Sequence, residues 1–383
     1  MSSAPVTLRA ADKRAEWDRG VERVLQDPRA VDAVFQPIVD LRRGTVVGYE
    51  TLARFAPPPE ASPDRWLAEA ESRGVADALS ARILARALQQ RTSLPPNTFL
   101  SVNVAPKDVA GPAVREALLA PATLAGVVIE VTEHAPIGDF AELDRLLAPF
   151  REAGAVIAVD DAGAGYAGLT HILELRPQLV KLDRALVSGI DRDEAKRVLV
   201  ETIGNATGRL DAWLLAEGIE RQEELDVLVG MGVPLGQGYA LGRPSAPWSS
   251  VPPAMAARIR LATSRRDTGG TTIERVLEER PVVPEGSPLR ATKLFTADPD
   301  LDVAVVVSEA LRPTALATRE QTLQGEPAWP ATIVQRSSEC GSVLRRAMTR
   351  PRPIRFHPLV CCDELGRCLG VVPVERLVEQ VLA

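Results

Sequence analysis

Two aspartates stand side by side at the end of an apolar stretch, in the sequence AVIAVDDAGAG (155–165). The first five residues have the composition of a buried β-strand, and Asp160 and Asp161 follow directly. Two adjacent carboxylates repel one another, and burying either is unfavourable unless a positive charge lies nearby. A metal ion would supply that charge, provided that other parts of the chain contribute further ligands.

Other polar residues follow strand-like apolar runs in the same way. They are Glu50 after VVGY, Asn103 after FLSV, Glu130 after VVI, Lys181 after LV, Asp183 after LVKL and Glu217 after WLLA. One carboxylate at a strand end is ordinary, because such residues often cap the next helix. Their repetition at one strand after another predicts a cluster instead. Carboxylate and amide oxygens are hard ligands, which favours Mg²⁺ or Mn²⁺ over zinc or copper.

Lys181 is unusual because it lies between Val180 and Leu182 in an apolar run. A lysine at such a position needs an anionic neighbour or a phosphate.

The glycines after the aspartates permit another interpretation. GAGYAG (163–168) matches G-x-G-x-x-G after a strand, with Asp183 further on, and resembles a dinucleotide-binding fingerprint. We reject it because Asp160 and Asp161 would face the pyrophosphate, and because Pro177 leaves room for only a short helix. Gly163 and Gly165 are better explained as a flexible loop beside a metal site.

The elements that must position these residues alternate from about residue 30 to 245. The expected strands are 34–39, 45–55, 98–104, 126–132, 155–161, 178–183, 212–219 and 237–241. The expected helices are 10–26, 63–90, 107–119, 139–153, 192–208 and 221–231. About eight strands over roughly 220 residues predict an α/β fold, a closed (β/α)8 TIM-like barrel. The carboxyl ends of its strands would bring the polar residues to one mouth.

The composition excludes several classes of function. The net charge of −6 gives no basic footprint for nucleic acid, and no apolar run approaches the roughly 20 residues of a membrane span. The polar N-terminus is not a secretory signal, so we expect a cytoplasmic protein. Three histidines leave little material for histidine-rich metal sites or Ser-His-Asp chemistry. The four cysteines form no CxxC pair, which favours free thiols over a zinc site.

We expect four segments along the chain. They are an N-terminal helix and lead-in (1–29), the barrel (30–250), a helix and linker (251–272) and a smaller α/β domain (273–383). The proline-rich APWSSVPP (246–253) and the polar SRRDTGGTT (264–272) mark the end of the barrel. The last segment contains two similar pieces, each running from a short helix into a strand, a turn and another strand.

The motifs of residues 30–247 together resemble EAL-type cyclic di-GMP phosphodiesterases. The matching stretches are FQPIVDL, YETLARF, SVNVAP, IEVTE, VDDAGAGYAGL, LRPQLVKLDRALV, AEGIE and QGYALGRP. The resemblance implies hydrolysis of one phosphodiester bond of cyclic di-GMP to give linear pGpG. It also implies two divalent cations, Mg²⁺ or Mn²⁺, at the mouth of the barrel, and a homodimer.

The resemblance also assigns roles to individual residues. The implied metal ligands are Glu50, Asn103, Glu130, Asp160 and Asp161. The implied catalytic residues are Glu50, Lys181 and Glu217. The implied substrate-binding residues are Gln36, Arg54, Asp183 and Gln237, with Gln237 also ordering the metal–water shell. Glu133, Gly163 and Gly165 would support the loop 162–169.

The departures from the family pattern remove no ligand. The namesake triplet reads ETL, with Thr51 at a position that binds no metal, and Ala105 and Ala162 replace a common serine and phenylalanine. A catalytically weak cyclic di-GMP receptor, or a sensory or interaction module regulated through the C-terminal domain, remains the alternative. That domain faintly resembles a pair of CBS-type repeats, which implies an adenine nucleotide as a possible ligand; a small packing domain explains it equally well.

Overall fold

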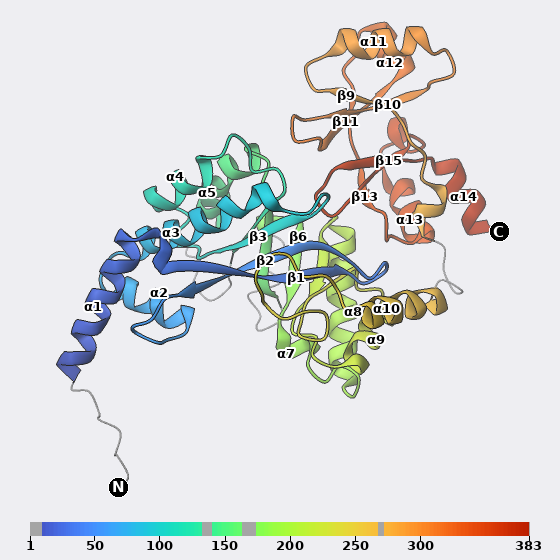
Figure 1. Cartoon of the computed structure of the whole chain (residues 1–383). Helices are drawn as coiled ribbons and strands as arrows, with labels where there is room; N and C mark the ends of the chain where they lie inside the picture. The colour runs from blue at the N-terminus through green and yellow to red at the C-terminus, as the bar shows by residue number, and fades with distance from the viewer. Residues whose placement is uncertain (1–9, 132–139, 163–173, 267–271, 383) are drawn as a thin grey trace. The chain divides into compact units, whose positions relative to one another are not determined.

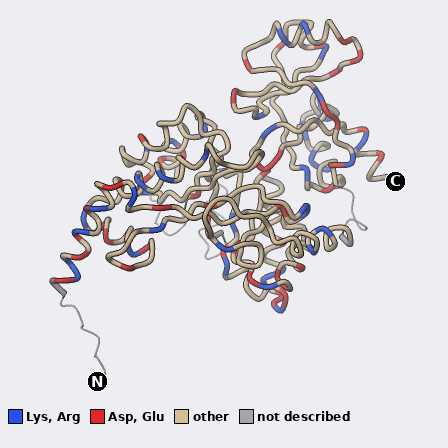
Figure 2. Tube along the Cα trace, in the orientation of Figure 1, with Lys and Arg blue, Asp and Glu red and all other residues tan. Residues whose placement is uncertain are grey.

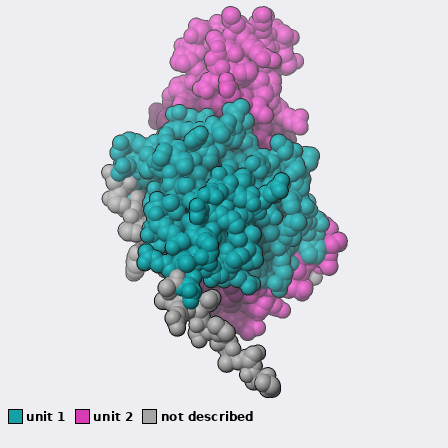
Figure 3. All heavy atoms as spheres, turned by 60° about the vertical axis from the view of Figure 1, so that its left-hand side comes forward, with its two compact units in different colours: residues 1–39, 45–175, 237–252 teal, residues 40–44, 176–236, 253–383 magenta. Residues whose placement is uncertain are grey.

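The computed structural model describes residues 10–131, 140–162, 174–266 and 272–382. The described residues form two compact units by their internal contacts, one within residues 1–39, 45–175 and 237–252, and the other within residues 40–44, 176–236 and 253–383 (Figure 3). None of the described helices is long and apolar enough to cross a membrane. Figure 2 shows basic and acidic residues interspersed along the chain.

Eight strands form a closed barrel in chain order, which confirms the predicted fold (Figure 1). They are β1 (Val31–Asp40), β2 (Thr45–Phe55), β3 (Phe99–Val104), β4 (Val127–Val131), β5 (Val156–Ala162), β6 (Leu179–Leu182), β7 (Trp213–Ala216) and β8 (Leu235–Gly236). Parallel pairing joins β2 through β5, and β6 through β8. β1 differs from the expected parallel arrangement, because the turn at 41–44 is too short for a crossover to a parallel neighbour.

Helices alternate with most of these strands. They are α1 (Ala10–Gln26), α2 (Pro63–Ser72), α3 (Ala76–Gln89), α4 (Pro112–Leu119), α5 (Phe140–Glu152), α7 (Arg184–Val187), α8 (Glu194–Arg209), α9 (Gln222–Met231) and α10 (Pro253–Arg266). Short 3₁₀ helices occur at Pro28–Ala30, Gln90–Ser93, Ile273–Val276 and Arg352–Ile354. The predicted helix 63–90 is two helices, because Gly74 adopts a positive φ of 69° between α2 and α3.

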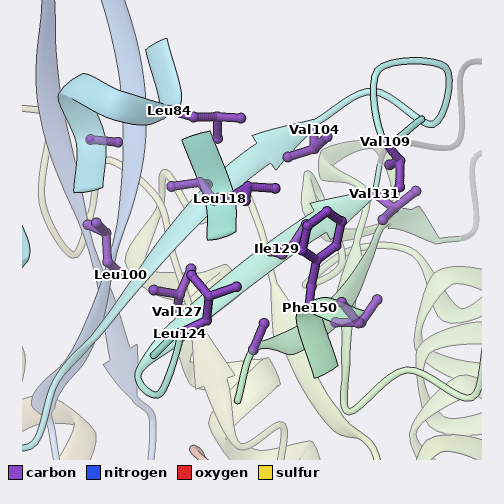
Figure 4. Packing of buried hydrophobic residues seen from close by; sticks show 14 of the residues in the cluster. Leu84, Leu100, Val104, Val109, Leu118, Leu124, Val127, Ile129, Val131 and Phe150 are labelled. Carbon is purple, nitrogen blue, oxygen red and sulfur yellow. The ribbon is translucent and has the colours of Figure 1, made fainter. Parts of the chain in front are cut away.

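Alternate strand residues build the core between the sheet and its helices in the first unit. Figure 4 shows Leu100 and Val104 of β3 and Ile129 of β4 packed with Leu118 of α4 and Phe150 of α5. Because successive side chains of a strand point to opposite faces, the residues between these apolar ones face the barrel interior. The helices therefore fix which side chains reach the interior.

The C-terminal region contains the same topology twice. The first copy is β9 (Val282–Pro284), α11 (Pro288–Ala297), β10 (Val303–Val307), β11 (Pro313–Thr318) and α12 (Arg319–Gln324). After β12 (Trp329–Pro330) comes the second copy: β13 (Ile333–Gln335), α13 (Cys340–Thr349), β14 (Leu359–Cys362), β15 (Cys368–Val372) and α14 (Val374–Leu382). In each copy the first two strands pair in parallel and the last two antiparallel. The repeat is therefore structural, while its likeness to CBS repeats and the predicted segment boundaries stay predictions.

The four cysteines are free thiols in this region. Cys340, Cys361 and Cys362 are buried, and burial raises the pKa of Cys361 to about 12. A thiol with a raised pKa is a poor nucleophile, so these cysteines act as small apolar core residues.

Candidate functional site

The strand register places the polar residues of the first unit on one face of the sheet. Glu50 of β2 is the register partner of Ser101 in β3, and Asn103 is the partner of Glu130 in β4. Glu130 in turn pairs with Ala158 of β5, and Asp160 follows two residues later. Register partners, and residues two apart in a strand, share a face. These side chains therefore all point away from the helices and into the barrel.

Glu50 accepts hydrogen bonds from two side-chain amides. Gln237 donates its Nε2 to Glu50 Oε2 at 2.6 Å, and Asn103 donates its Nδ2 to Glu50 Oε1 at 2.9 Å. Gln237 is 3% exposed and Glu50 is 9% exposed, so Gln237 donates to a nearly buried carboxylate. Hydrogen bonds to a charged group are worth more than neutral ones, and these two stabilise the charge of Glu50.

Gln36 joins the same group of side chains. Its Oε1 accepts from Gln237 Nε2 at 3.1 Å, and its own Nε2 donates to the Gly242 carbonyl at 3.1 Å. The Oε1 of Gln237 is buried and has no hydrogen-bond partner among the described residues. A buried acceptor without a donor is costly, so this oxygen is suited to a water or a ligand donor at the site.

Glu130 is fully buried, at 0% exposure, and Ser101 donates its hydroxyl to Glu130 Oε1 at 2.5 Å. Ser101 is also fully buried, and the sequence interpretation did not assign it a role. Its position two residues before Asn103, on the same strand face, was the available signal. The hydroxyl helps to offset the cost of burying the Glu130 carboxylate.

Lys181 and Glu217 form an ion pair in the second unit. Lys181 pairs in register with Leu215, and Glu217 lies two residues further on, so the two side chains share a face. The Lys181 Nζ lies 2.5 Å from Glu217 Oε1, with the Lys181 side chain 1% exposed and that of Glu217 21% exposed. The anionic neighbour that the sequence required for Lys181 is thus Glu217. A carboxylate beside a buried ammonium offsets part of the cost of burying that charge.

The remaining predicted site residues divide into two groups. Asp183 is half-buried and caps α7, accepting from the Ala185 backbone N–H at 2.6 Å. Arg54 is exposed and donates to the carbonyl of Ala53 at 2.8 Å. Glu133, Gly163 and Gly165 lie outside the described residues, and so does the side chain of Asp161. Their assigned roles stay predictions.

The donor set fits a hard divalent cation in kind. Its predicted ligand atoms are all oxygens, from the carboxylates of Glu50, Glu130 and Asp160 and from the amide group of Asn103. Gln237 Oε1 adds a buried acceptor. Within the described ranges, no three His, Cys, Asp or Glu side chains are placed to hold a metal ion. The set predicted from the sequence also needs Asp161, whose side chain lies outside the described residues, and the amide oxygen of Asn103, a residue type outside that group.

Comparison with known families identifies the barrel. The family profile described as the EAL domain matches residues 23–244, which is more than half of the chain. The chain belongs to the EAL domain family.

Relatives of the EAL domain carry informative names. The probable cyclic di-GMP phosphodiesterase PdeG of Escherichia coli K12 is 29% identical over 221 residues, which cover 55% of this chain and 44% of the relative. Cyclic di-GMP phosphodiesterase PdeL of the same organism is 27% identical over 225 residues, covering 55% and 61%. The chain therefore spans less than two thirds of either relative.

Solved structures agree with the EAL fold. The complex of PaMucR phosphodiesterase with c-di-GMP superposes with a TM-score of 0.54 at 25% identity, covering 61% of this chain and 98% of that one. The manganese and cyclic di-GMP complex of Klebsiella pneumoniae BlrP1 gives a TM-score of 0.52 at 29% identity, covering 58% of each chain.

Proposed function

We propose that the EAL domain of this chain hydrolyses one phosphodiester bond of cyclic di-GMP and releases linear pGpG. The observation that carries this proposal is the interior cluster in which Gln237 and Asn103 hold the Glu50 carboxylate. Relatives named as cyclic di-GMP phosphodiesterases, and EAL structures named as complexes with that nucleotide, support the choice of substrate.

The reaction would depend on divalent cations, Mg²⁺ or Mn²⁺, two per site. The residues that would hold them are Glu50, Asn103, Glu130, Asp160 and Asp161. Bound cations of this kind lower the pKa of a water and stabilise negative charge on phosphoryl oxygens. The manganese in the BlrP1 complex supports this choice of metal.

The protein's own side chains would orient the reactants and hold protons. The Lys181 ammonium, which pairs with Glu217, would present a positive charge to an attacking water or a phosphate oxygen. Gln237 fixes the orientation of Glu50, and Gln36 is held beside it for the substrate. The exposed Arg54 guanidinium is free of ion pairs that the structure describes, and would contact a phosphate.

Incubation of the full-length protein with cyclic di-GMP and Mn²⁺, followed by chromatography, tests the proposal. We expect linear pGpG, and we expect EDTA and Glu50→Ala each to abolish its formation. Ca²⁺ should inhibit, because it accepts looser and larger coordination shells than Mg²⁺ or Mn²⁺. Tight binding of cyclic di-GMP without any product would refute hydrolysis and favour the receptor function.

We propose a second role, as a ligand sensor, for the C-terminal region. The observation that favours it is the duplicated strand–helix–strand–strand–helix topology with identical pairing directions. Titration of the full-length protein with ATP or AMP, with hydrolysis as the readout, tests an adenine nucleotide. Unchanged hydrolysis and no heat of binding would refute the sensor. Size-exclusion chromatography with light scattering tests the proposed homodimer.

A further inference from the structure

The second C-terminal copy contacts two segments that lead directly into barrel strands. All of these contacts lie within the second compact unit. One contact involves the turn before β2, and the other involves Asp211, two residues before β7. β2 carries Glu50, and Glu217 directly follows β7. The contacts thus lie at the turn that precedes β2 and at the residues that precede β7, and later residues of these two segments belong to the proposed site.

The first contact, called here the hairpin contact, consists of Asp40, Arg336 and Glu364. Arg336 Nη2 lies 2.8 Å from Asp40 Oδ2 and also pairs with Glu364 Oε1. The Arg336 side chain is only 12% exposed, that of Asp40 is 6% exposed and that of Glu364 is 9% exposed. Ion pairs buried to this degree are costly to break from one side, because the partner charge stays in a low-dielectric environment.

Asp40 is the last residue of β1 and also shapes the turn that follows it. Its Oδ1 accepts the backbone N–H groups of Arg42 and Arg43 at 2.7 and 2.9 Å. Glu274 in turn pairs with both arginine side chains, at 3.0 and 2.5 Å. One carboxylate therefore both accepts from the backbone of the β1–β2 turn and pairs with Arg336 of the C-terminal region.

The second contact, called here the loop contact, joins Arg346 of α13 to Asp211. Both guanidinium nitrogens of Arg346 donate to the two carboxylate oxygens of Asp211, in a bidentate arrangement. Asp211 has a left-handed backbone conformation with φ of 59°, which a non-glycine residue holds only when its surroundings enforce it. Leu210, Asp211 and Ala212 are the whole connection between α8 and β7, so little slack separates Arg346 from the strand.

We propose that Arg336 and Arg346 are positioning residues of the barrel site, acting from the C-terminal region through the starts of β2 and β7. This inference rests on the proposed metal-dependent function of the site. Strands are stiff elements that transmit a shift at one end to the other. The Arg346 contact sets β7 and therefore Glu217, and the Arg336 contact sets β2 and therefore Glu50.

Mn²⁺ binding by the full-length protein, measured by calorimetry, tests the proposal without relying on catalysis. We expect Arg346→Gln and Arg336→Gln each to weaken Mn²⁺ binding by about 2- to 30-fold, the range for couplings between distant sites. The control is Arg345→Gln, an exposed arginine of the same helix, which should bind as the wild type does. Equal Mn²⁺ affinity in all four proteins would overturn the proposal.

A double-mutant cycle separates the loop contact from its backbone. Asp211→Gly removes the carboxylate but retains a residue suited to the left-handed conformation. We expect Asp211→Gly, Arg346→Gln and their combination to weaken Mn²⁺ binding to the same extent, because all three break one contact. Additive losses would mean that Arg346 acts elsewhere, and would also overturn the proposal.

Hydrogen exchange gives a reciprocal test. Because coupling between two sites is mutual, Mn²⁺ should slow amide exchange in β14 and β15 of the wild type. The same addition should leave these strands unchanged in Arg346→Gln. If Mn²⁺ binds the wild type but leaves amide exchange in β14 and β15 unchanged, the Arg336 and Arg346 contacts only hold the C-terminal region in place. This result would overturn the proposal. If the wild type binds Mn²⁺ but forms no pGpG, the proposed hydrolysis fails while this inference stays testable.

Discussion

Gln237 offers the sharpest test of how the site is built. The substitution Gln237→Leu keeps the size of the side chain but removes the amide that donates to Glu50 Oε2 and Gln36 Oε1. The first hydrogen bond meets a nearly buried carboxylate and is worth about 1.5–3 kcal/mol; the second is neutral and is worth about 0.5–1.5 kcal/mol. We therefore expect the free energy of unfolding to fall by about 2–4.5 kcal/mol.

The assay is thermal unfolding of the full-length protein in EDTA. For a domain of this size each kcal/mol lowers Tm by about 2–4 °C, so Gln237→Leu should unfold roughly 4–18 °C below the wild type. The matched control is Gln26→Leu in α1, where an exposed glutamine donates to the Glu22 carboxylate at 3.0 Å. An exposed pair of the same chemistry should change stability by no more than about 0.5 kcal/mol. Equal Tm values for the two variants would refute the structural role of Gln237.

Gln237→Glu separates a metal site from a purely structural cluster. It places a second carboxylate where the amide contacts Glu50, and two like charges at that distance repel. In EDTA this variant should be less stable than the wild type, and Mn²⁺ should raise its Tm by more than it raises that of the wild type. A smaller or equal gain would mean that no cation binds next to Glu50, contrary to the proposed mechanism.

Three further predictions concern single side chains. Ser101→Ala should lower the free energy of unfolding by about 1–3 kcal/mol and weaken Mn²⁺ binding, since it removes a donor to the buried Glu130. Urea denaturation would measure the first effect and calorimetry the second. Unchanged Mn²⁺ affinity would limit Ser101 to a structural role. Lys181→Met should lower kcat with little change in Mn²⁺ affinity, because the ammonium contributes charge to the reaction and not a ligand; a kcat equal to that of the wild type would exclude Lys181 from catalysis. Burial raises the pKa of Glu364 despite its contact with Arg336, so the contribution of the protonated side chain to stability is present at low pH and is lost as pH rises through the raised value. Urea denaturation from pH 4 to 7 should therefore show the free energy of unfolding of Glu364→Gln rising relative to that of the wild type. A difference that stays constant with pH would contradict this.

The barrel was predictable from the sequence because its signals are local. Apolar strands, amphipathic helices and glycine breaks each occupy one short window of the chain. The turn at 41–44 was visible in the same way, since no helical segment separates the expected strands 34–39 and 45–55. The sequence indicated a parallel sheet there because the alternation of the later elements dominated the pattern. The break at Gly74 was missed because the apolar periodicity continues through it.

The hydrogen-bond partners of the site could not be read from the sequence. They depend on the register between strands that are far apart in the chain, such as the pairing of Glu50 with Ser101. Sequence reasoning singled out Glu50, Glu130 and Lys181 because charged residues in apolar runs stand out. It passed over Ser101, because a serine in a strand carries no such signal until its partner across the ladder is known.

The register also explains how residues distant in the chain come to share the inner face of the barrel. Asn103 lies two residues beyond the register partner of Glu50, Asp160 lies two beyond that of Glu130, and Glu217 lies two beyond that of Lys181. A closed barrel staggers its strands, so the two-residue step keeps side chains on the inner face while moving along the strand. A one-residue insertion in β3 before Asn103 would turn that amide toward α4 and the apolar core. We therefore expect such an insertion to abolish Mn²⁺ binding, whereas an insertion in the exposed turn at residue 96 should leave it intact.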